Sequence, residues 1–150
     1  MTSRTRGASS TNDGSRRSPR VRSLDVSGLT LDTGALVALE RRDLRAWRLV
    51  AAARADGERV TVPASAITEW WRGQRGPVAS LLDAFDVDPV GRRLARIAGE
   101  ALARVGRGPR AIDAQVMASA ASRGDRVLTG DVGDLERLRA VFPSVRVLRV

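Results

Sequence analysis

From about residue 23 onward, short apolar runs alternate with longer stretches whose apolar residues recur every three or four positions. Short runs bounded by Gly, Pro or Asp are typical of strands, whereas the spacing of three to four is typical of amphipathic helices. We predict strands at residues 29–31, 59–62, 85–87, from 127 and at 145–150. We predict helices at residues 35–41, 44–55, from 63 through AITEWW, and at 77–84, 91–105, 109–122 and 132–141. This alternation predicts an α/β fold with a short, mostly parallel central sheet and helices on both faces.

The pattern stops at the amino-terminal end. Residues 1–23 are rich in Ser, Arg, Gly and Thr and carry six arginines against one aspartate, a net charge of +5. Such a composition cannot form a packed core, so we predict a disordered basic tail and one domain at residues 24–150. The tail is either inert or the result of a start codon misplaced upstream of the real domain. There is no apolar signal region and no run near the roughly 20 residues of a membrane span. We expect a cytoplasmic protein without membrane contact.

Composition narrows the chemistry sharply. The 150-residue chain has no histidine, no cysteine and no lysine, so all 26 basic residues are arginine. These absences exclude Ser-His and Cys-His nucleophile pairs, thiolate or imidazole metal sites, disulfides and lysine Schiff bases. The formal net charge is +9, and the residues after the tail carry only +4 of it, so the domain itself is mildly basic. Catalysis would have to rest on carboxylates.

Four acidic residues stand where apolar residues are expected. Asp32 follows a predicted strand in LTLDTGAL, and Asp131 follows another in VLTGD. Glu69 shares a helical face with Ala66 in PASAITEWW, and Asp113 in RAIDAQVMASA lies on an apolar helical stripe. An ionised carboxylate on a buried face costs several kcal/mol, roughly, unless it is paired or bound to metal.

Each of these acids also has an ordinary structural explanation. Asp32 and Asp131 could cap the helices that follow them, and Asp113 lies near a helix N-terminus, where an anion is favoured. Glu69 could pair with Arg72 three residues later. Taken together, two strand-end acids at one sheet edge and two inward helix acids favour a metal site. We expect most other acids, Glu58 and Asp125 among them, to be solvated surface groups.

The segments LDTGALVAL, PASAITEWWRG, RAIDAQVMASA and VLTGDVGDL resemble, in this order, those of PIN-domain ribonucleases, in particular VapC toxins of bacterial toxin–antitoxin pairs. The resemblance implies a three-layer α/β/α sandwich and an endoribonuclease that cleaves RNA with Mg²⁺ or Mn²⁺. It also implies a cognate VapB-like antitoxin and a homodimer. The acidic site that it implies consists of Asp32, Glu69, Asp113 and Asp131. Asp134 corresponds to a further acid of many members, and Thr129 to a hydroxyl that supports the cluster.

The chemistry of the residues leads in the same direction. Hard divalent cations prefer oxygen ligands, and the best candidate ligands are Asp32 with Asp113 or Asp131, while Glu69 could hold or orient water. A haloacid-dehalogenase-like phosphatase needs an acid two residues after the first one, where this chain has Gly34, and a lysine, which the chain lacks. A nucleotide-binding Rossmann domain needs GxGxxG after the first strand, and that motif is absent as well. The remaining alternative is a PIN-like module that binds RNA or protein without cutting.

Overall fold

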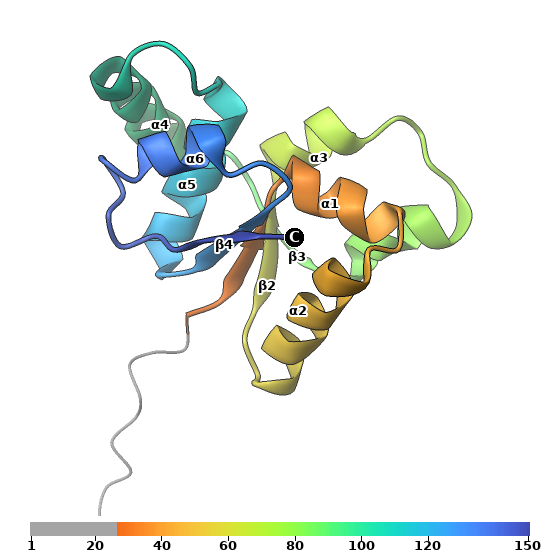
Figure 1. Ribbon diagram of the computed structural model, residues 1–150. Coiled ribbons are helices and arrows are strands. Elements are labelled where there is room, and N and C mark those ends of the chain that lie inside the picture. Colours follow the sequence, from red (N-terminus) through yellow and green to blue (C-terminus); the bar gives the residue numbers. More distant parts are fainter. Residues whose placement is uncertain (1–26) are drawn as a thin grey trace, which may run out of the picture.

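A computed structural model describes residues 27–150; the predicted tail, 1–23, and the predicted domain start at residue 24 lie outside the described residues. Five parallel strands form one sheet in the order β3-β2-β1-β4-β5 (Figure 1). The chain therefore runs from β1 outward to β3 and then returns past β1 to β4 and β5. The strands are β1 Leu29–Leu31, β2 Val60–Pro63, β3 Asp86–Asp88, β4 Arg126–Thr129 and β5 Val147–Arg149.

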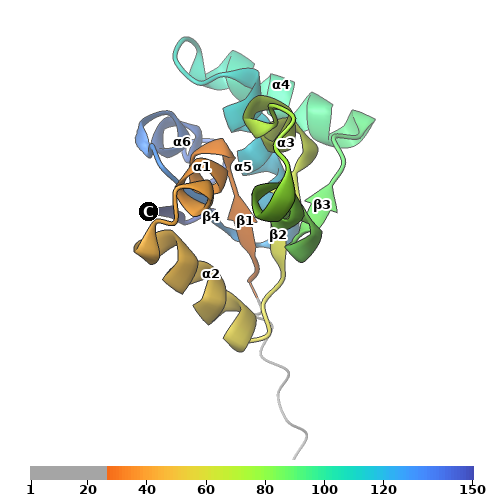
Figure 2. The ribbon, with the colours of Figure 1, turned by 90° about the vertical axis from the view of Figure 1, so that its right-hand side faces the viewer.

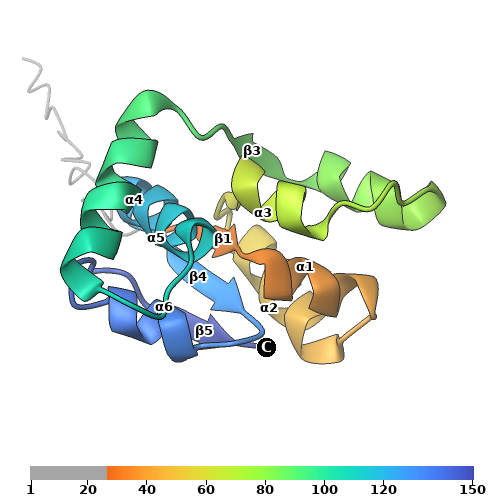
Figure 3. The ribbon, with the colours of Figure 1, turned by 90° about the horizontal axis from the view of Figure 1, so that it is seen from above.

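Helices cover both faces of this sheet, as seen from above in Figure 3. Helices α1, α2 and α3 lie on one face, and α4, α5 and α6 lie on the other. Right-handed crossovers require this division, because the chain changes direction across the sheet after β3. The predicted three-layer α/β/α sandwich is confirmed. The helices are α1 Thr33–Glu40, α2 Leu44–Ala55, α3 Ala64–Trp70, the 3₁₀ helix η1 Gly76–Ala84, α4 Arg92–Val105, α5 Ala111–Arg123 and α6 Gly133–Leu138.

The core explains why the central strands read as apolar runs. All three residues of β1 and all four of β2 are buried, because helices cover both of their faces. Helix α5 turns Val116, Met117 and Ala120 into the core, which confirms the apolar stripe predicted around Asp113. This packing fixes the register of α5 against the sheet and therefore the position of Asp113.

Three local predictions were inexact. Pro63 ends β2, where it is paired with Asp88 of β3, and is the N-cap of α3, so the helix begins one residue later than predicted, at Ala64. Residues 76–84 form a 3₁₀ helix instead of an α-helix. Helix α6 ends at Leu138, three residues earlier than predicted.

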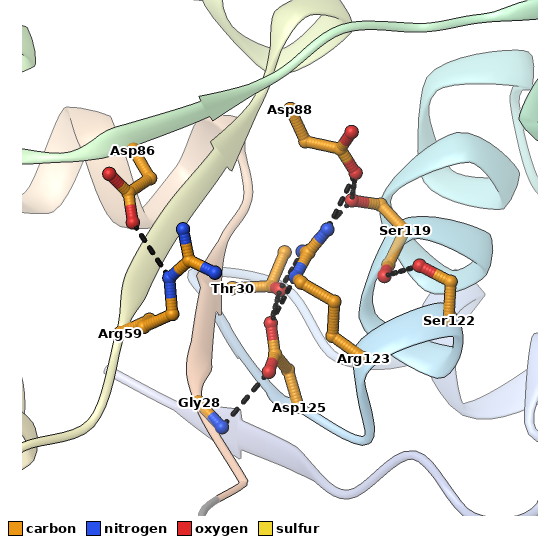
Figure 4. Close-up of polar contacts among 9 residues, drawn as sticks. All are labelled: Gly28, Thr30, Arg59, Asp86, Asp88, Ser119, Ser122, Arg123 and Asp125. Carbon is orange, nitrogen blue, oxygen red and sulfur yellow. Dashed lines mark hydrogen bonds and ion pairs between the residues drawn. The ribbon is translucent and has the colours of Figure 1, made fainter.

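The prediction that Asp125 is a solvated surface group was wrong. Its side chain is only 4 % exposed and accepts hydrogen bonds from the Gly28 N–H at 2.9 Å and the Thr30 hydroxyl at 2.8 Å (Figure 4). Arg123, at the end of α5, donates to Asp125 at 2.8 Å and pairs with Asp88 at 2.6 Å. These residues form an enclosed network under α5, in which each charge has an opposite charge and several hydrogen bonds. We call it the Arg123 network.

Glu58 is not a free surface group either. Its carboxylate is paired with Arg126, and the exposed fractions of the two side chains are 15 % and 29 %. Glu58 and Asp125 therefore lie in polar stretches of sequence that are typical of the surface, although both are fixed in ion pairs. Within residues 27–150, none of the helices combines the length and the apolar character needed to cross a membrane.

Candidate active site

The predicted acids gather at the carboxyl edge of the sheet, beside β1 and β4. After β1 the chain runs to one edge of the sheet at β3, and it then crosses to β4 and continues to the other edge at β5. The neighbours β1 and β4 therefore mark the point where the strand order reverses. Open parallel sheets bind ligands in the crevice at such a switch point. Helices α1, α3, α5 and α6 end or begin around it (Figures 1 and 2).

Asp32 is the residue that joins β1 to α1. Its carboxylate Oδ1 accepts a hydrogen bond from the Ala35 N–H at 2.8 Å, so the predicted helix cap is confirmed. Burial raises the pKa of the Asp32 carboxyl to about 6, and the negative charge of Asp113 adds to this, against lowering by hydrogen bonds from Thr129 and from backbone N–H groups. An ionised Asp32 is therefore energetically costly in this pocket, and a nearby cation would relieve that cost.

Glu69 projects from α3 toward α1 and α5. Its Oε2 accepts a hydrogen bond from the Thr33 hydroxyl at 2.5 Å, and its Oε1 pairs with the guanidinium of Arg110. The suggested pair with Arg72 does not form; Arg72 donates instead to the backbone carbonyl of Trp71 at 2.8 Å. Glu69 is thus tied to two other elements rather than to its own helix.

Asp113 lies in the first turn of α5, where the helix dipole favours an anion. Its Oδ2 accepts from the Arg110 N–H at 2.7 Å and from the Arg110 Nε at 3.4 Å. The carboxylate of Asp113 raises the pKa of the Arg110 guanidinium further above its ordinary value. Asp113 and Arg110 therefore stabilise each other and the start of α5.

Asp131 and Thr129 form the turn after β4. The Thr129 hydroxyl donates to the Asp131 carbonyl at 2.8 Å and accepts from its N–H at 3.0 Å. The Asp131 carboxylate is exposed and accepts from the Gly133 N–H at 3.0 Å, so it contacts the start of α6 without being its formal N-cap. Asp134 lies in the first turn of α6, 4.0 Å from Arg137.

All four predicted acids, together with Asp134, line one pocket with a volume of about 360 Å³. Thr129 does not line it and instead supports the Asp131 turn from below. Arg72 and Arg110 line the same pocket and bring positive charge to its rim. Within residues 27–150, no group of three acids is close enough to hold one metal ion as the side chains lie. Arg110 pairs with both Glu69 and Asp113.

A contact between two glycines brings the strand-end turns together. A Cβ added to Gly34 would lie 2.7 Å from the Gly130 backbone nitrogen, closer than any real contact allows. The absence of side chains at this point lets the start of α1 pack directly on the turn after β4. The close approach of the Asp32 and Asp131 turns depends on it.

Sequence reasoning missed the part played by Arg110 and Thr33. The sequence patterns assigned no role to Arg110, whereas it bridges two of the four acids. Its position three residues before Asp113 at a helix start was the available signal, because residues so spaced are neighbours there. No local pattern could have linked Thr33 to Glu69, which is 36 positions away.

Comparison with known protein families identifies the family of this chain. The sequence matches the PIN domain family over residues 29–140, which is most of the chain and includes every residue of the pocket. The chain belongs to the PIN domain family. A search of curated proteins finds no match to this sequence.

Solved structures with this PIN fold include components of toxin–antitoxin assemblies. VapBC2 from Rickettsia felis, bound to a DNA fragment from its promoter, is matched with a TM-score of 0.64 and 12 % identity over 81 % of this chain and 98 % of that one. FitAcB from Neisseria gonorrhoeae is matched with a TM-score of 0.58 and 18 % identity over 80 % and 96 %. A toxin–antitoxin complex from Klebsiella pneumoniae gives 0.58 and 18 % over 81 % and 96 %. At these identities the likeness concerns the fold.

The donor set of this PIN domain suits a hard divalent cation. Asp32, Glu69, Asp113 and Asp131 supply oxygen atoms only, which Mg²⁺ and Mn²⁺ prefer. Burial, together with the nearby charge of Asp113, raises the pKa of Asp32, so a cation beside Asp32 would favour its ionised form. The residues present therefore fit a metal ion by their chemistry, although Glu69 and Asp113 are engaged by Arg110.

Proposed function

We propose that this PIN domain is a metal-dependent endoribonuclease, the toxin of a toxin–antitoxin pair acting in the cytoplasm. One observation carries the proposal: four carboxylates from four separate segments line a single pocket at the switch point of the sheet. PIN nucleases generally use divalent metal ions, and this chain has no histidine or cysteine for another kind of hydrolytic centre. Carboxylate chemistry is thus the one route that both family and composition support.

In this proposal Asp32, Asp113 and Asp131, which line one pocket but do not lie close enough together in this structure to share an ion, would move closer to hold Mg²⁺ or Mn²⁺. When bound, such an ion lowers the pKa of a water molecule and neutralises charge on the scissile phosphate. Glu69 orients the attacking water through its carboxylate, which the Thr33 hydroxyl holds in place. Thr129 fixes the turn that presents Asp131, and Asp134 adds a further acid at the rim.

The basic rim provides attraction for the substrate. Arg72 lines the pocket, and a backbone phosphate of RNA is drawn to such a guanidinium by charge. Trp71, 40 % exposed, is available to stack on a base, whereas Trp70 is only 3 % exposed and donates to Glu40 at 2.8 Å. The two adjacent tryptophans therefore have different roles, one at the surface and one in the core.

The proposed partners follow from the matched structures. Those structures are toxin–antitoxin assemblies, some of them bound to DNA. We accordingly assign this chain a VapB- or FitA-type antitoxin and a homodimeric state. The alternative from another class is a PIN module that binds RNA or protein without cutting it, and the complete set of pocket acids favours the enzyme.

The decisive experiment is cleavage of a random-sequence RNA pool with Mg²⁺ or Mn²⁺ and with EDTA. We expect cleavage that requires the metal and that falls roughly a hundredfold or more in Asp32→Asn and Asp113→Asn, because each removes a charged ligand. Asp83→Asn, at an exposed acid outside the pocket, is the matched control and keeps full activity. Circular dichroism verifies the fold of each variant. Full activity in both pocket variants contradicts the proposal, and RNA binding without cleavage by the wild type supports the binding module.

A further inference from the structure

Arg110 lies among the pocket acids in the manner of a bound cation. Its guanidinium pairs with Glu69 through Nη1 and contacts Asp113 through Nε at 3.4 Å and Nη2 at 3.4 Å. The arginine side chain is 62 % exposed, whereas those of Glu69 and Asp113 are 22 % and 13 % exposed. A solvated positive charge at the pocket mouth therefore neutralises two acids that are largely withdrawn from water.

We infer that Arg110 is an internal counter-ion that competes with the divalent cation for Glu69 and Asp113 and swings out when the cation binds. The inference rests on the proposed metal site and adds a regulatory residue to it. A guanidinium and a divalent cation repel each other, and both are attracted to the same carboxylates. Occupation by one therefore weakens occupation by the other.

The backbone geometry allows the side chain to leave while its anchor stays. The Arg110 N–H remains bonded to Asp113 Oδ2 at 2.7 Å, which holds the residue at the start of α5. The preceding turn is fixed by Gly108, whose φ of +125° favours glycine and whose Cα faces the Arg137 side chain at close range. Only the long, exposed side chain of Arg110 has to move, and its rotation needs no rearrangement of the fold.

Arg72 offers a matched comparison. It lines the same pocket, yet within residues 27–150 its guanidinium forms no ion pair with an acid and donates only to the nearby Trp71 carbonyl. Removal of Arg72 lowers the positive charge of the rim by the same amount as removal of Arg110. A difference between the two variants therefore reports the specific contacts of Arg110 and not general electrostatics.

Mn²⁺ binding tests the inference without any measurement of activity. Free Mn²⁺ is titrated by electron paramagnetic resonance against the wild-type chain and the variants Arg110→Gln, Arg110→Lys, Arg72→Gln and Asp32→Asn. We expect Arg110→Gln to bind Mn²⁺ about fivefold more tightly than the wild type, with a much smaller gain in Arg72→Gln. Arg110→Lys, which keeps the charge but cannot reach both acids in the same way, lies between Arg110→Gln and the wild type.

A second measurement follows Arg110 directly. The ¹⁵N signal of its Nε, identified by its loss in Arg110→Gln, shifts when Mg²⁺ is added to the wild type and stays constant in Asp32→Asn.

The outcomes separate the inference from the proposed function. If Arg110→Gln binds Mn²⁺ no more tightly than the wild type while Asp32→Asn loses binding, the metal site stands and the competition is refuted. Weaker Mn²⁺ binding by Arg110→Gln than by the wild type also refutes the competition, because it is the result expected if Arg110 only positions the acids. If Asp32→Asn binds Mn²⁺ as the wild type does, the proposed metal site itself is wrong.

Discussion

Helix α5 carries an arginine–carboxylate cluster at each end, and the two clusters differ in how completely the protein satisfies them. At the C-terminal end, Arg123 and Asp125 are enclosed, and Asp125 accepts bonds from a backbone N–H, a hydroxyl and a guanidinium (Figure 4). At the N-terminal end, the acids face a pocket, and their counter-charge is the mostly exposed Arg110.

This difference separates a structural cluster from a functional one. Three elements converge on Arg123, since Asp88 is the last residue of β3, Thr30 lies in β1 and Asp125 precedes β4. Such a network fixes the packing of α5. The pocket beside it, lined by Asp88 and Arg123, contains a single acid, and that acid is already paired. The pocket at the other end contains several acids, and burial raises the pKa of one of them, Asp32, so that a cation there would favour its ionised form.

The largest expected effect comes from breaking the enclosed cluster. Arg123→Met leaves Asp88 and Asp125 without their cation, and we expect the free energy of unfolding to fall by about 3–5 kcal/mol. In the matched variant Arg110→Met, the lost ion pairs belong to an exposed arginine, so the decrease stays below about 1 kcal/mol. Urea denaturation measures both. Equal losses would remove the distinction between the two clusters.

A second, pH-dependent effect sharpens the comparison. The pKa of Asp32 is raised from 3.8 to about 6 in the folded protein, so the folded state binds this proton more tightly than the unfolded state. The ionised carboxylate therefore destabilises the fold above about pH 6, and the penalty disappears as the pH falls toward 4. Asp32→Asn keeps the cap acceptor and removes the charge, so we expect it to be more stable than the wild type by up to about 3 kcal/mol at pH 8 and nearly equal at pH 4.

Thermal and urea unfolding in EDTA at the two pH values provide the measurement. Asp125→Asn is the counterpart in the Arg123 network and should destabilise at pH 8, because it weakens the bond with Arg123. An Asp32→Asn variant that is less stable than the wild type at pH 8 would show that the negative charge at this position is already compensated.

The smallest effect concerns the link between α1 and α3. Thr33→Val removes the hydroxyl that donates to Glu69 Oε2 and keeps the shape of the side chain, so we expect a loss of about 1 kcal/mol. Thr68→Val, which removes an exposed hydroxyl bonded within its own helix, is the control and should change stability less. If both variants behave alike, Glu69 is positioned by Arg110 without help from Thr33.

The strands and the order of the pocket acids could be predicted because both depend on local sequence, that is, on short apolar runs and on helical periodicity. Leu29–Leu31 is an apolar run followed by an acid, and Asp113 interrupts a clear helical stripe. The partners of these acids could not be predicted, because they depend on which helices the sheet brings together. Glu69 and Arg110 are 41 positions apart, and their contact exists only once α3 and α5 lie side by side.

The burial of Asp125 could not be predicted either, because it too depends on contacts between residues far apart in the sequence. Its neighbours Gly124 and Arg126 look like those of a surface turn, and only the return of β4 beside β1 encloses it. Burial of a polar residue between strands distant in sequence leaves no periodic trace, so local patterns identify apolar cores better than enclosed charges.

The contact between Gly34 and Gly130 has a consequence for how this fold can diversify. Because main chain packs on main chain there, the spacing between the turns after β1 and β4 does not depend on any side chain. Residues around the rim, such as Arg72 and Ile112, can therefore be exchanged to suit a different ligand without altering that spacing. In such a scaffold the spacing between the two turns that carry Asp32 and Asp131 stays constant, while the side chains around the pocket can change with the ligand.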